Sequence, residues 1–199
     1  MIKLGIVGTA GRNPIDKKTL GISHMKWMAE NVQCYVEHVI CATPSNVILV
    51  SGGSAWADHI AVQLYLTGEF AGLELYLPSK FDIKQKKYVN THEGRTLNAL
   101  HLECKNKTGM DIFEELTRAV SKKATKVTIQ RGFLPRNTLI AKNCDHLIAF
   151  TFSPNAPSDG GTFDTWKKTK HDNKTNFDLS LVVPSPEETK PVNNDVIEI

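Results

Sequence analysis

Three glycine-rich segments have residue types that can hold a phosphate group. The first follows the apolar run 2–7 and reads Gly5-x-x-Gly8-x-x-Gly11-Arg12-Asn13. Glycine lets the backbone approach an anion, N–H groups at a helix start donate hydrogen bonds, and arginine adds a charge-assisted pair. The spacing is not the dinucleotide fingerprint G-x-G-x-x-G, and it also fits a turn that needs glycine for its geometry. The candidate ligand-binding residues here are Gly8, Thr9, Gly11, Arg12 and Asn13.

The second segment lies between the apolar run 47–50 and a stretch with helical periodicity. Two glycines flanked by hydroxyl side chains form a plausible anion cradle. Asp58 follows near the expected helix start, where it faces the ligand crevice as a catalytic carboxylate or serves only as a first-turn acid that suits the helix dipole. We expect His59 to be a packed or surface histidine. The candidate ligand-binding residues are Ser51, Gly52, Gly53 and Ser54.

The third candidate region has two parts, each at the start of a predicted helix. Arg136 and Asn137 follow Gly132, and they offer a charge and an amide donor. Asn137 also fits a purely structural role as a cap or a bridge between loops. After the strand that ends at Phe152, a Gly-Gly-Thr sequence opens a second helix and can form a phosphate-sized nest of N–H groups. The candidates of this second part are Asp159, Gly160, Gly161 and Thr162, with Asp164 as a possible catalytic carboxylate.

A fourth set recurs at three-residue spacing on one predicted helix. Arg95, Asn98 and His101 share a face of that helix, so we predict that Arg95 and Asn98 contact the ligand. A solvated helix face is the alternative.

The elements that must position these residues alternate between strand and helix. This alternation predicts an α/β, doubly wound, mostly parallel sheet with helices on both faces, in the Rossmann-like manner. In such sheets the ligand crevice lies at the carboxyl ends of the strands, where the glycine-rich segments fall. We expect residues 79–94 to form a loop and residues 179–183 a final apolar run. Strands are expected at residues 2–7, 47–50, 73–77, 126–129 and 146–152, and helices at residues 17–40, 55–66, 95–104, 111–122, 135–143 and 162–169.

Composition limits the partners and the compartment. The 199 residues carry a formal net charge of +3, so no strong field indicates a nucleic-acid or membrane partner. We predict one domain over residues 1–183 and a flexible C-terminal tail over residues 184–199. The four cysteines, including Cys34 and Cys41, have no C-x-x-C pair, which favours buried thiols in a reducing, cytoplasmic setting. The pattern predicts no metal ligands and no cofactor.

The order of the motif residues resembles the SLOG superfamily. This Rossmann-like group includes DNA-processing protein A, the LONELY GUY phosphoribohydrolases and the molybdenum-cofactor carrier-like proteins. The resemblance spans Ile2 to about Lys170. It implies a nucleotide or nucleotide-derived ligand at the GG and GGT loops and a homo-oligomer, for which Met25, Trp27 and Met28 are either interface or core. The residues that carry it are Val50-Ser51-Gly52-Gly53-Ser54-Ala55-x-Ala57-Asp58-x-x-Ala61, Arg136-Asn137-x-x-Ile140-Ala141-x-x-x-Asp145-x-Leu147-Ile148-Ala149-Phe150 and Gly160-Gly161-Thr162-x-x-Thr165.

The chain departs from the phosphoribohydrolase signature P-G-G-x-G-T-x-x-E, because Thr165 stands where the resemblance would place the catalytic glutamate. Three functions therefore stay open. The first is a protein that senses or sequesters a phosphorylated nucleotide-derived small molecule. The second is a nucleoside-monophosphate phosphoribohydrolase or nucleotide N-glycosidase that uses Asp58 or Asp164. The third is a single-stranded nucleic-acid binder, whose affinity would fall steeply with salt.

Overall fold

The computed structural model describes residues 1–185 and shows an α/β protein built on six parallel strands. The strand order is β6-β3-β2-β1-β7-β8, and every neighbouring pair is parallel. The predicted fold class is confirmed. The sheet strands are β1 (Ile2–Gly8), β2 (Val47–Ser51), β3 (Gly72–Leu77), β6 (Thr125–Ile129), β7 (His146–Thr151) and β8 (Lys174–Asp178).

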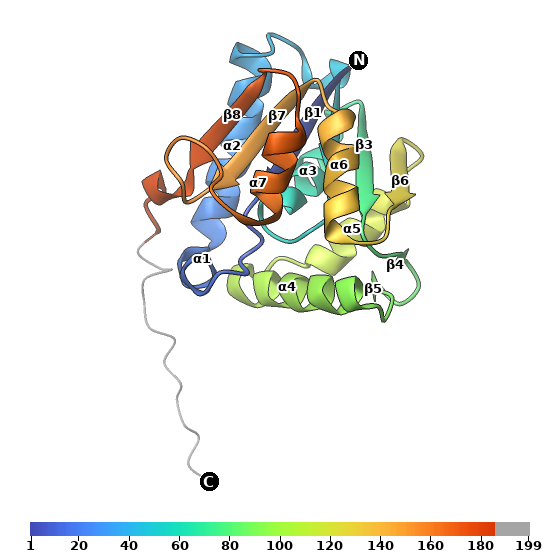
Figure 1. Ribbon diagram of the computed structural model, residues 1–199. Helices are drawn as coiled ribbons and strands as arrows, with labels where there is room; N and C mark the ends of the chain where they lie inside the picture. The colour runs from blue at the N-terminus through green and yellow to red at the C-terminus, as the bar shows by residue number, and fades with distance from the viewer. Residues whose placement is uncertain (186–199) are drawn as a thin grey trace.

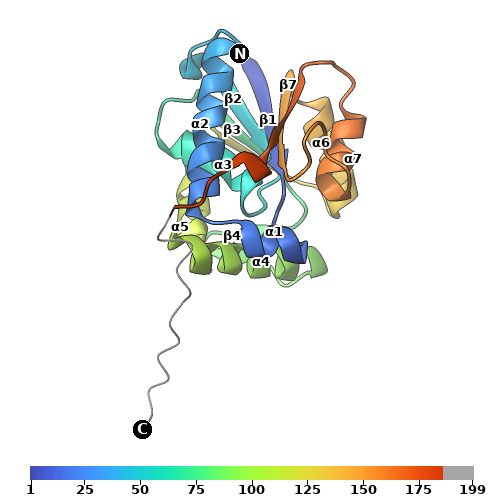
Figure 2. The same ribbon diagram turned by 90° about the vertical axis from the view of Figure 1, so that its left-hand side faces the viewer.

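Helices cover both faces of the sheet (Figures 1 and 2). One face carries α2 (Ile22–His38), α3 (Ala57–Leu66) and α5 (Ile112–Val120), and the other carries α6 (Phe133–Lys142) and α7 (Gly160–Lys168). In both views α1 (Pro14–Thr19) and α4 (His92–Thr108) lie beyond the carboxyl ends of the central strands. These two helices therefore stand at the edge of the sheet where we expected a ligand.

The side chains of β1 point alternately to the two faces of the sheet, and a hydrophobic core lies on each face. Leu4 and Ile6 point into the larger core under α2 and α3, whereas Val7 belongs to a smaller core with Ile140 of α6. Apolar residues that alternate at period two thus serve both faces, as a parallel sheet covered on both sides requires. Met25 and Met28 of α2 are buried in the larger core, so they are core residues within this chain.

Three predicted elements differ from the structure. The helix expected over residues 17–40 is two helices, because Gly21 adopts an extended conformation between α1 and α2. The expected loop over residues 79–94 contains a short hairpin, β4 (Phe81–Asp82) and β5 (Lys87–Tyr88), and the start of α4. The last strand, β8, precedes the apolar run that we expected to close the fold, and that run begins with the 3-10 helix Leu179–Leu181.

The prediction that all cysteines are buried is wrong for two of them. Cys34 and Cys41 are exposed, while Cys104 and Cys144 are buried. Cys34 lies on the solvent side of α2, because its neighbours Val32 and Val36 are the residues that pack on the sheet. Most of the predicted flexible tail, residues 186–199, lies outside the described residues. At the end of the described chain, the Ser185 amide donates to the Ser23 hydroxyl at 3.1 Å.

Candidate functional site

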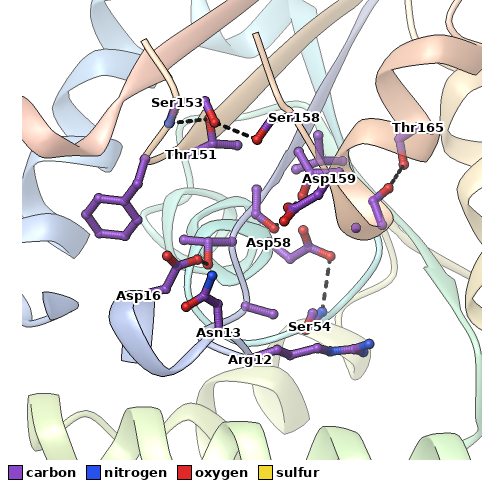
Figure 3. Close-up of a pocket in the computed structure, with 18 of the residues that line it drawn as sticks. Arg12, Asn13, Asp16, Ser54, Asp58, Thr151, Ser153, Ser158, Asp159 and Thr165 are labelled. Atoms are coloured by element: carbon purple, nitrogen blue, oxygen red, sulfur yellow. Dashed lines mark hydrogen bonds between the residues drawn. The ribbon is translucent and has the colours of Figure 1, made fainter. Parts of the chain in front are cut away.

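A cavity of about 450 Å³ lies at the carboxyl ends of β1 and β7 (Figure 3). These neighbouring strands are the point where the strand order reverses, because the chain builds β2, β3 and β6 on one side of β1 and then β7 and β8 on the other. Loops leave such a switch point in opposite directions and open a crevice there. The walls come from the loop after β1, the start of α1, the start of α3, the start of α6 and the loop from β7 into α7.

A buried ion pair lies on one wall of the cavity. Arg136 Nη1 on α6 donates to Asp58 Oδ2 on α3 at 3.2 Å, and the Ser54 amide donates to the same oxygen at 3.3 Å. Both charged side chains are less than a tenth exposed. Burial raises the pKa of Asp58, while the guanidinium and the Ser54 N–H act in the opposite direction. The two helices are therefore joined by a charged contact that a ligand in the cavity can reach.

At Gly52 and Gly53, other side chains of the protein occupy the space that a side chain would need, and neither glycine lines the cavity. A Cβ at Gly52 would lie 1.2 Å from Arg136 Nη1, so the guanidinium occupies the space that a side chain would need. Gly53 has a φ of +66°, and its carbonyl accepts a 2.7 Å hydrogen bond from the Tyr88 hydroxyl. Of the four predicted binding residues in this segment, only Ser54 lines the cavity; Ser51, Gly52 and Gly53 do not.

Arg12 brings a second cation to the cavity from the loop after β1. Its Cζ lies 4.3 Å from the centre of the Phe133 ring, which holds the guanidinium by a cation–π contact. Within residues 1–185, Arg12 forms no ion pair with an acidic side chain. Burial and the nearby charge of Arg136 both lower the pKa of Arg12. The negative charge of Asp58 acts in the opposite direction on this pKa, so Arg12 is a positive charge at the cavity that lies near a carboxylate without forming an ion pair with it.

The start of α7 forms the opposite part of the wall. Gly160 has a φ of +66° and the helix follows directly, but the side chain of Asp159 at the N-cap makes no capping hydrogen bond. The first N–H groups of α7 therefore have no side-chain acceptor. The Thr162 hydroxyl donates to the Gly8 carbonyl at 2.8 Å and ties α7 to β1. Gly8, Asp159, Gly160, Gly161 and Thr162 line the cavity, as do Thr9 and Asn13 of the first segment, whereas Gly11 does not.

Asn137 bridges two parts of the third region. Its Nδ2 lies 3.1 Å from the Gly161 carbonyl and 3.1 Å from Asp164 Oδ2, so it donates to both. Asp164 also accepts from Lys168 Nζ at 2.7 Å and does not line the cavity. Asn137 does line it. Of the two predicted catalytic carboxylates, the structure therefore brings only Asp58 to the cavity.

Two buried polar atoms on the cavity residues have no hydrogen-bond partner within the described chain. They are Ser54 Oγ and Arg136 Nε. Ser54 and Arg136 are 4% and 7% exposed, so water does not readily replace the missing partner. Buried polar groups are normally paired, because leaving one unpaired costs about 1–3 kcal/mol. These atoms mark a place where the protein alone does not satisfy its own polar groups.

Comparison with known proteins finds one clear relative of viral origin. The chain is 42% identical over 180 residues to the "Uncharacterized protein R261" of Acanthamoeba polyphaga mimivirus, and the match covers 90% of this chain and 97% of the relative. The chain belongs to the family of this viral protein. No family model and no solved structure matches the chain. The proposed function of this family therefore rests on the cavity and its side chains.

Arg95, Asn98 and His101, which we expected on one helix face, lie on α4 and do not line the cavity. Arg95 and Asn98 border a separate surface hollow near β5, where Asn98 exchanges two 2.9 Å hydrogen bonds with the backbone of Tyr88. His101 is fully buried beside His59, and burial lowers the pKa of His101 to about 3. His59 is packed, as expected, and bonds Glu115 at 2.7 Å. The face shared by these residues supports the hairpin and the core rather than the cavity.

Sequence reasoning missed several residues of the cavity wall. Asp16 of α1 accepts a 2.6 Å hydrogen bond from the Thr9 hydroxyl, and Phe133 and Phe152 add aromatic surface. Ser153 and Ser158 add hydroxyls that lie 3.0 Å apart. The local signals for a helix start here are Asn13 at the N-cap, Pro14 at the first helical position and Asp16 in the first turn.

No helix in residues 1–185 has the length and apolar character needed to cross a membrane. The same part of the chain contains no group of three or more His, Cys, Asp or Glu side chains placed to hold a metal ion.

Proposed function

We propose that the protein binds a phosphorylated, nucleotide-derived small molecule in the cavity at the carboxyl ends of β1 and β7. One observation carries the proposal: Arg12, Arg136 and the start of α7 all border the same cavity of about 450 Å³. Two guanidinium groups and the positive end of a helix dipole favour a phosphate group. The volume lies within the range of about 300–1,000 Å³ that is typical of small-molecule sites.

The other wall residues favour a nucleotide over a bare anion. Asp16 and Asp159 are carboxylates that accept hydrogen bonds from sugar hydroxyls but repel free phosphate. Ile15 and Phe152 offer apolar surface for a base. A ligand with an anionic end, hydroxyl groups and a flat ring would interact with the arginines, the carboxylates and the apolar side chains of the cavity at the same time.

The unpaired polar atoms support the same proposal. Ser54 Oγ and Arg136 Nε are buried at the cavity wall and lack partners. A ligand with several acceptor oxygens, accompanied by small side-chain adjustments, would give each of them a partner. The site would therefore gain hydrogen bonds on binding that the protein by itself does not make.

We also propose that the protein is a SLOG superfamily member. The motif residues Asp58, Arg136, Asn137 and the range Gly160–Thr162 are far apart in the sequence and border one cavity. That convergence is what a shared ligand site requires, and it supports the resemblance.

Calorimetric titration with the 5′-mono- and diphosphates of adenosine, guanosine, cytidine and uridine tests the proposal. We expect at least one nucleotide to bind with a dissociation constant well below about 1 mM and about tenfold or more tighter than inorganic phosphate. The amide signals of Gly160 and Gly161 should shift in NMR spectra during that titration. The proposal fails if every nucleotide binds more weakly than about 1 mM, or if the shifts lie elsewhere.

A second candidate function is cleavage of an N-glycosidic bond. The observation that favours it is Asp58, a buried carboxylate at the cavity wall whose pKa is raised by burial, as a proton donor requires. Chromatography of the same incubations would then show free base, and Asp58→Asn would abolish its release. Unchanged nucleotide after long incubation leaves binding alone.

A further inference from the structure

Four aromatic side chains, one from each of four elements, pack together next to the cavity wall, and we call them the histidine cluster. His101 of α4 and His59 of α3 are both 0% exposed, and their ring centres lie 6.1 Å apart. The ring centre of Tyr88 on β5 lies 5.5 Å from that of His101, and the ring centre of Phe113 on α5 lies at 5.6 Å. His59 directly follows Asp58, so the cluster adjoins a residue that lines the cavity.

Each histidine of the cluster has one ring nitrogen with an acceptor and one without a partner. His101 Nδ1 lies 2.7 Å from the Leu97 carbonyl, and His59 Nε2 lies 2.7 Å from the Glu115 carboxylate. Both oxygens only accept, so these two nitrogens carry the ring protons. The other nitrogens, His101 Nε2 and His59 Nδ1, are buried and have no hydrogen-bond partner within the described chain. A second ring proton on His101 would therefore find no acceptor while the cluster is packed.

The groups that face His101 do not favour a positive charge on its ring. They are the rings of His59 from α3, Tyr88 from β5 and Phe113 from α5. The Glu115 carboxylate on α5 bonds His59 instead. Burial lowers the pKa of His101 to about 3, and the nearby His59 acts in the same direction. A histidine in water keeps its ordinary pKa of 6.5, so His101 binds a proton far more readily when the cluster is open.

α4 and the β4–β5 hairpin form one unit that supports the cavity wall from outside the sheet. α4 packs mainly against α5 and β5 rather than against the six-stranded sheet, and it lies beyond the carboxyl ends of the central strands (Figures 1 and 2). Asn98 of α4 holds β5 by its two hydrogen bonds to the Tyr88 backbone. The Tyr88 hydroxyl in turn donates to the Gly53 carbonyl at 2.7 Å, and the neighbouring Gly52 packs against Arg136 of the wall. Separation of this unit from α3 would therefore remove a support of the wall.

We propose that the histidine cluster makes this support of the cavity wall sensitive to acid. His101 takes up a second ring proton when the unit of α4 and the hairpin separates from α3, because water then accepts the hydrogen bond. Below about pH 6.5 the open state binds more protons than the packed state, so a falling pH increases its population. The six-stranded sheet contains no part of this unit, and we expect it to stay folded. This inference goes beyond the proposed function, because it concerns the protein without any ligand.

Hydrogen exchange of the full chain at about pH 7 and about pH 5, measured by mass spectrometry and corrected for the chemical exchange rate, tests the proposal. The opening constant of peptides over residues 81–108 should rise about tenfold or more at the lower pH, because the open state gains a proton there. The peptide over residues 51–56 should follow them, since Tyr88 holds Gly53. Peptides from β1 and β7 should change by less than about threefold.

Two histidine variants of α4 separate the cluster from other effects of acid. In His101→Asn the side-chain amide can still donate to the Leu97 carbonyl, but it takes up no proton. Its α4 peptides should differ by less than about threefold between the two pH values, even where this variant opens more easily at both. His92→Asn, at an exposed histidine of the same helix, is the matched control and should keep the full response of the unchanged protein.

NMR of the unchanged protein gives a measurement that does not depend on a variant. The His101 ring signals of the packed protein should keep the positions of the neutral ring from about pH 7 to about pH 5. The inference is overturned if those signals titrate in this range while α4 stays protected, or if His101→Asn responds to acid as the unchanged protein does. Equal loss of protection in the sheet peptides also overturns it, because acid then unfolds the whole domain. Nucleotide titrations decide the proposed function separately.

Discussion

Arg136 is the residue on which the geometry of the cavity wall depends most. Its guanidinium fills the space left by Gly52, bonds Asp58 at 3.2 Å and lies 5.9 Å from the ring of Phe133. The carboxylate of Asp58 is buried, and within residues 1–185 it accepts one other hydrogen bond, from the Ser54 amide. Removal of the guanidinium leaves a buried carboxylate without a counter-charge.

We predict that Arg136→Met lowers the free energy of unfolding by about 3 kcal/mol near pH 7. Burial raises the pKa of Asp58 above 3.8 in the folded state, so the folded protein binds this proton more tightly than the unfolded chain. Stability contributed by Asp58 therefore falls as the pH rises from 3.8 through the folded-state pKa. Loss of Arg136 raises the folded-state pKa of Asp58 further and so widens the pH range over which stability falls.

The stability deficit of Arg136→Met should therefore be smaller near pH 4 than near pH 7 in urea unfolding measurements. The double variant Asp58→Asn with Arg136→Met is the control, and its deficit should not change over the same range. A single-variant deficit that is independent of pH would contradict the buried-charge explanation.

The short helix α1 shows how an element can depend on polar contacts alone. It lines the cavity with Ile15 and Asp16, yet none of its six residues is buried. Lys107 of α4 donates to the carbonyls of Lys17 and Leu20 at the end of α1, where a positive charge suits the helix dipole. This contact ties α1 to α4.

We predict that Lys107→Gln speeds hydrogen exchange in the peptide over residues 13–21 by about fivefold or more, because local opening of α1 becomes easier. Mass spectrometry measures this exchange. Lys105→Gln, which removes the neighbouring 2.9 Å contact to Asp111, should leave that peptide unchanged. Equal exchange in both variants would mean that Lys107 does not hold α1.

Among the strands, those with an apolar sequence could be predicted from the sequence, whereas the last strand, β8, could not. Residues 47–50 and 147–150 are apolar runs because both sides of a parallel sheet are covered. β8 reads Lys-Thr-Asn-Phe-Asp, a polar run at the edge of the sheet, and it pairs only with β7. Phe177 of β8 packs against the rings of Phe150, Trp27 and Tyr35, and no local pattern reveals these contacts.

At the scale of the whole molecule, Gly8 is the residue where the end of β1 lies against both β7 and α3 and also lines the cavity. A Cβ at Gly8 would lie 2.4 Å from the Phe150 carbonyl oxygen and 2.5 Å from the Ala57 Cβ. The first neighbour is a backbone atom of β7 and the second is the short side chain of Ala57 at the start of α3, so neither can give way unless its strand or helix shifts. The glycine therefore sets how closely α3 approaches the sheet.

We predict that Gly8→Ala destabilises the protein by about 2–3 kcal/mol, as forced overpacking does. Gly161→Ala is the matched control at the same cavity, because its Cβ would lie at an ordinary 3.5 Å from Asn137. That variant should change the free energy of unfolding by less than about 1 kcal/mol. Thermal and urea unfolding of the two variants provide the comparison, and similar losses would contradict the packing argument.

The sequence by itself determined the alternation of strand and helix, the parallel sheet and the glycine-rich junctions at its carboxyl edge, because these follow from local periodicity and backbone flexibility. It also pointed to Arg12, Asp58, Arg136 and the start of α7 as candidates. Only the tertiary structure decided that Gly52 and Gly53 pack against Arg136 and Tyr88, and that Asp164 and Asn98 lie away from the cavity. Which side chains face the same space depends on strand order and helix packing, and those contacts join residues that are distant in the chain.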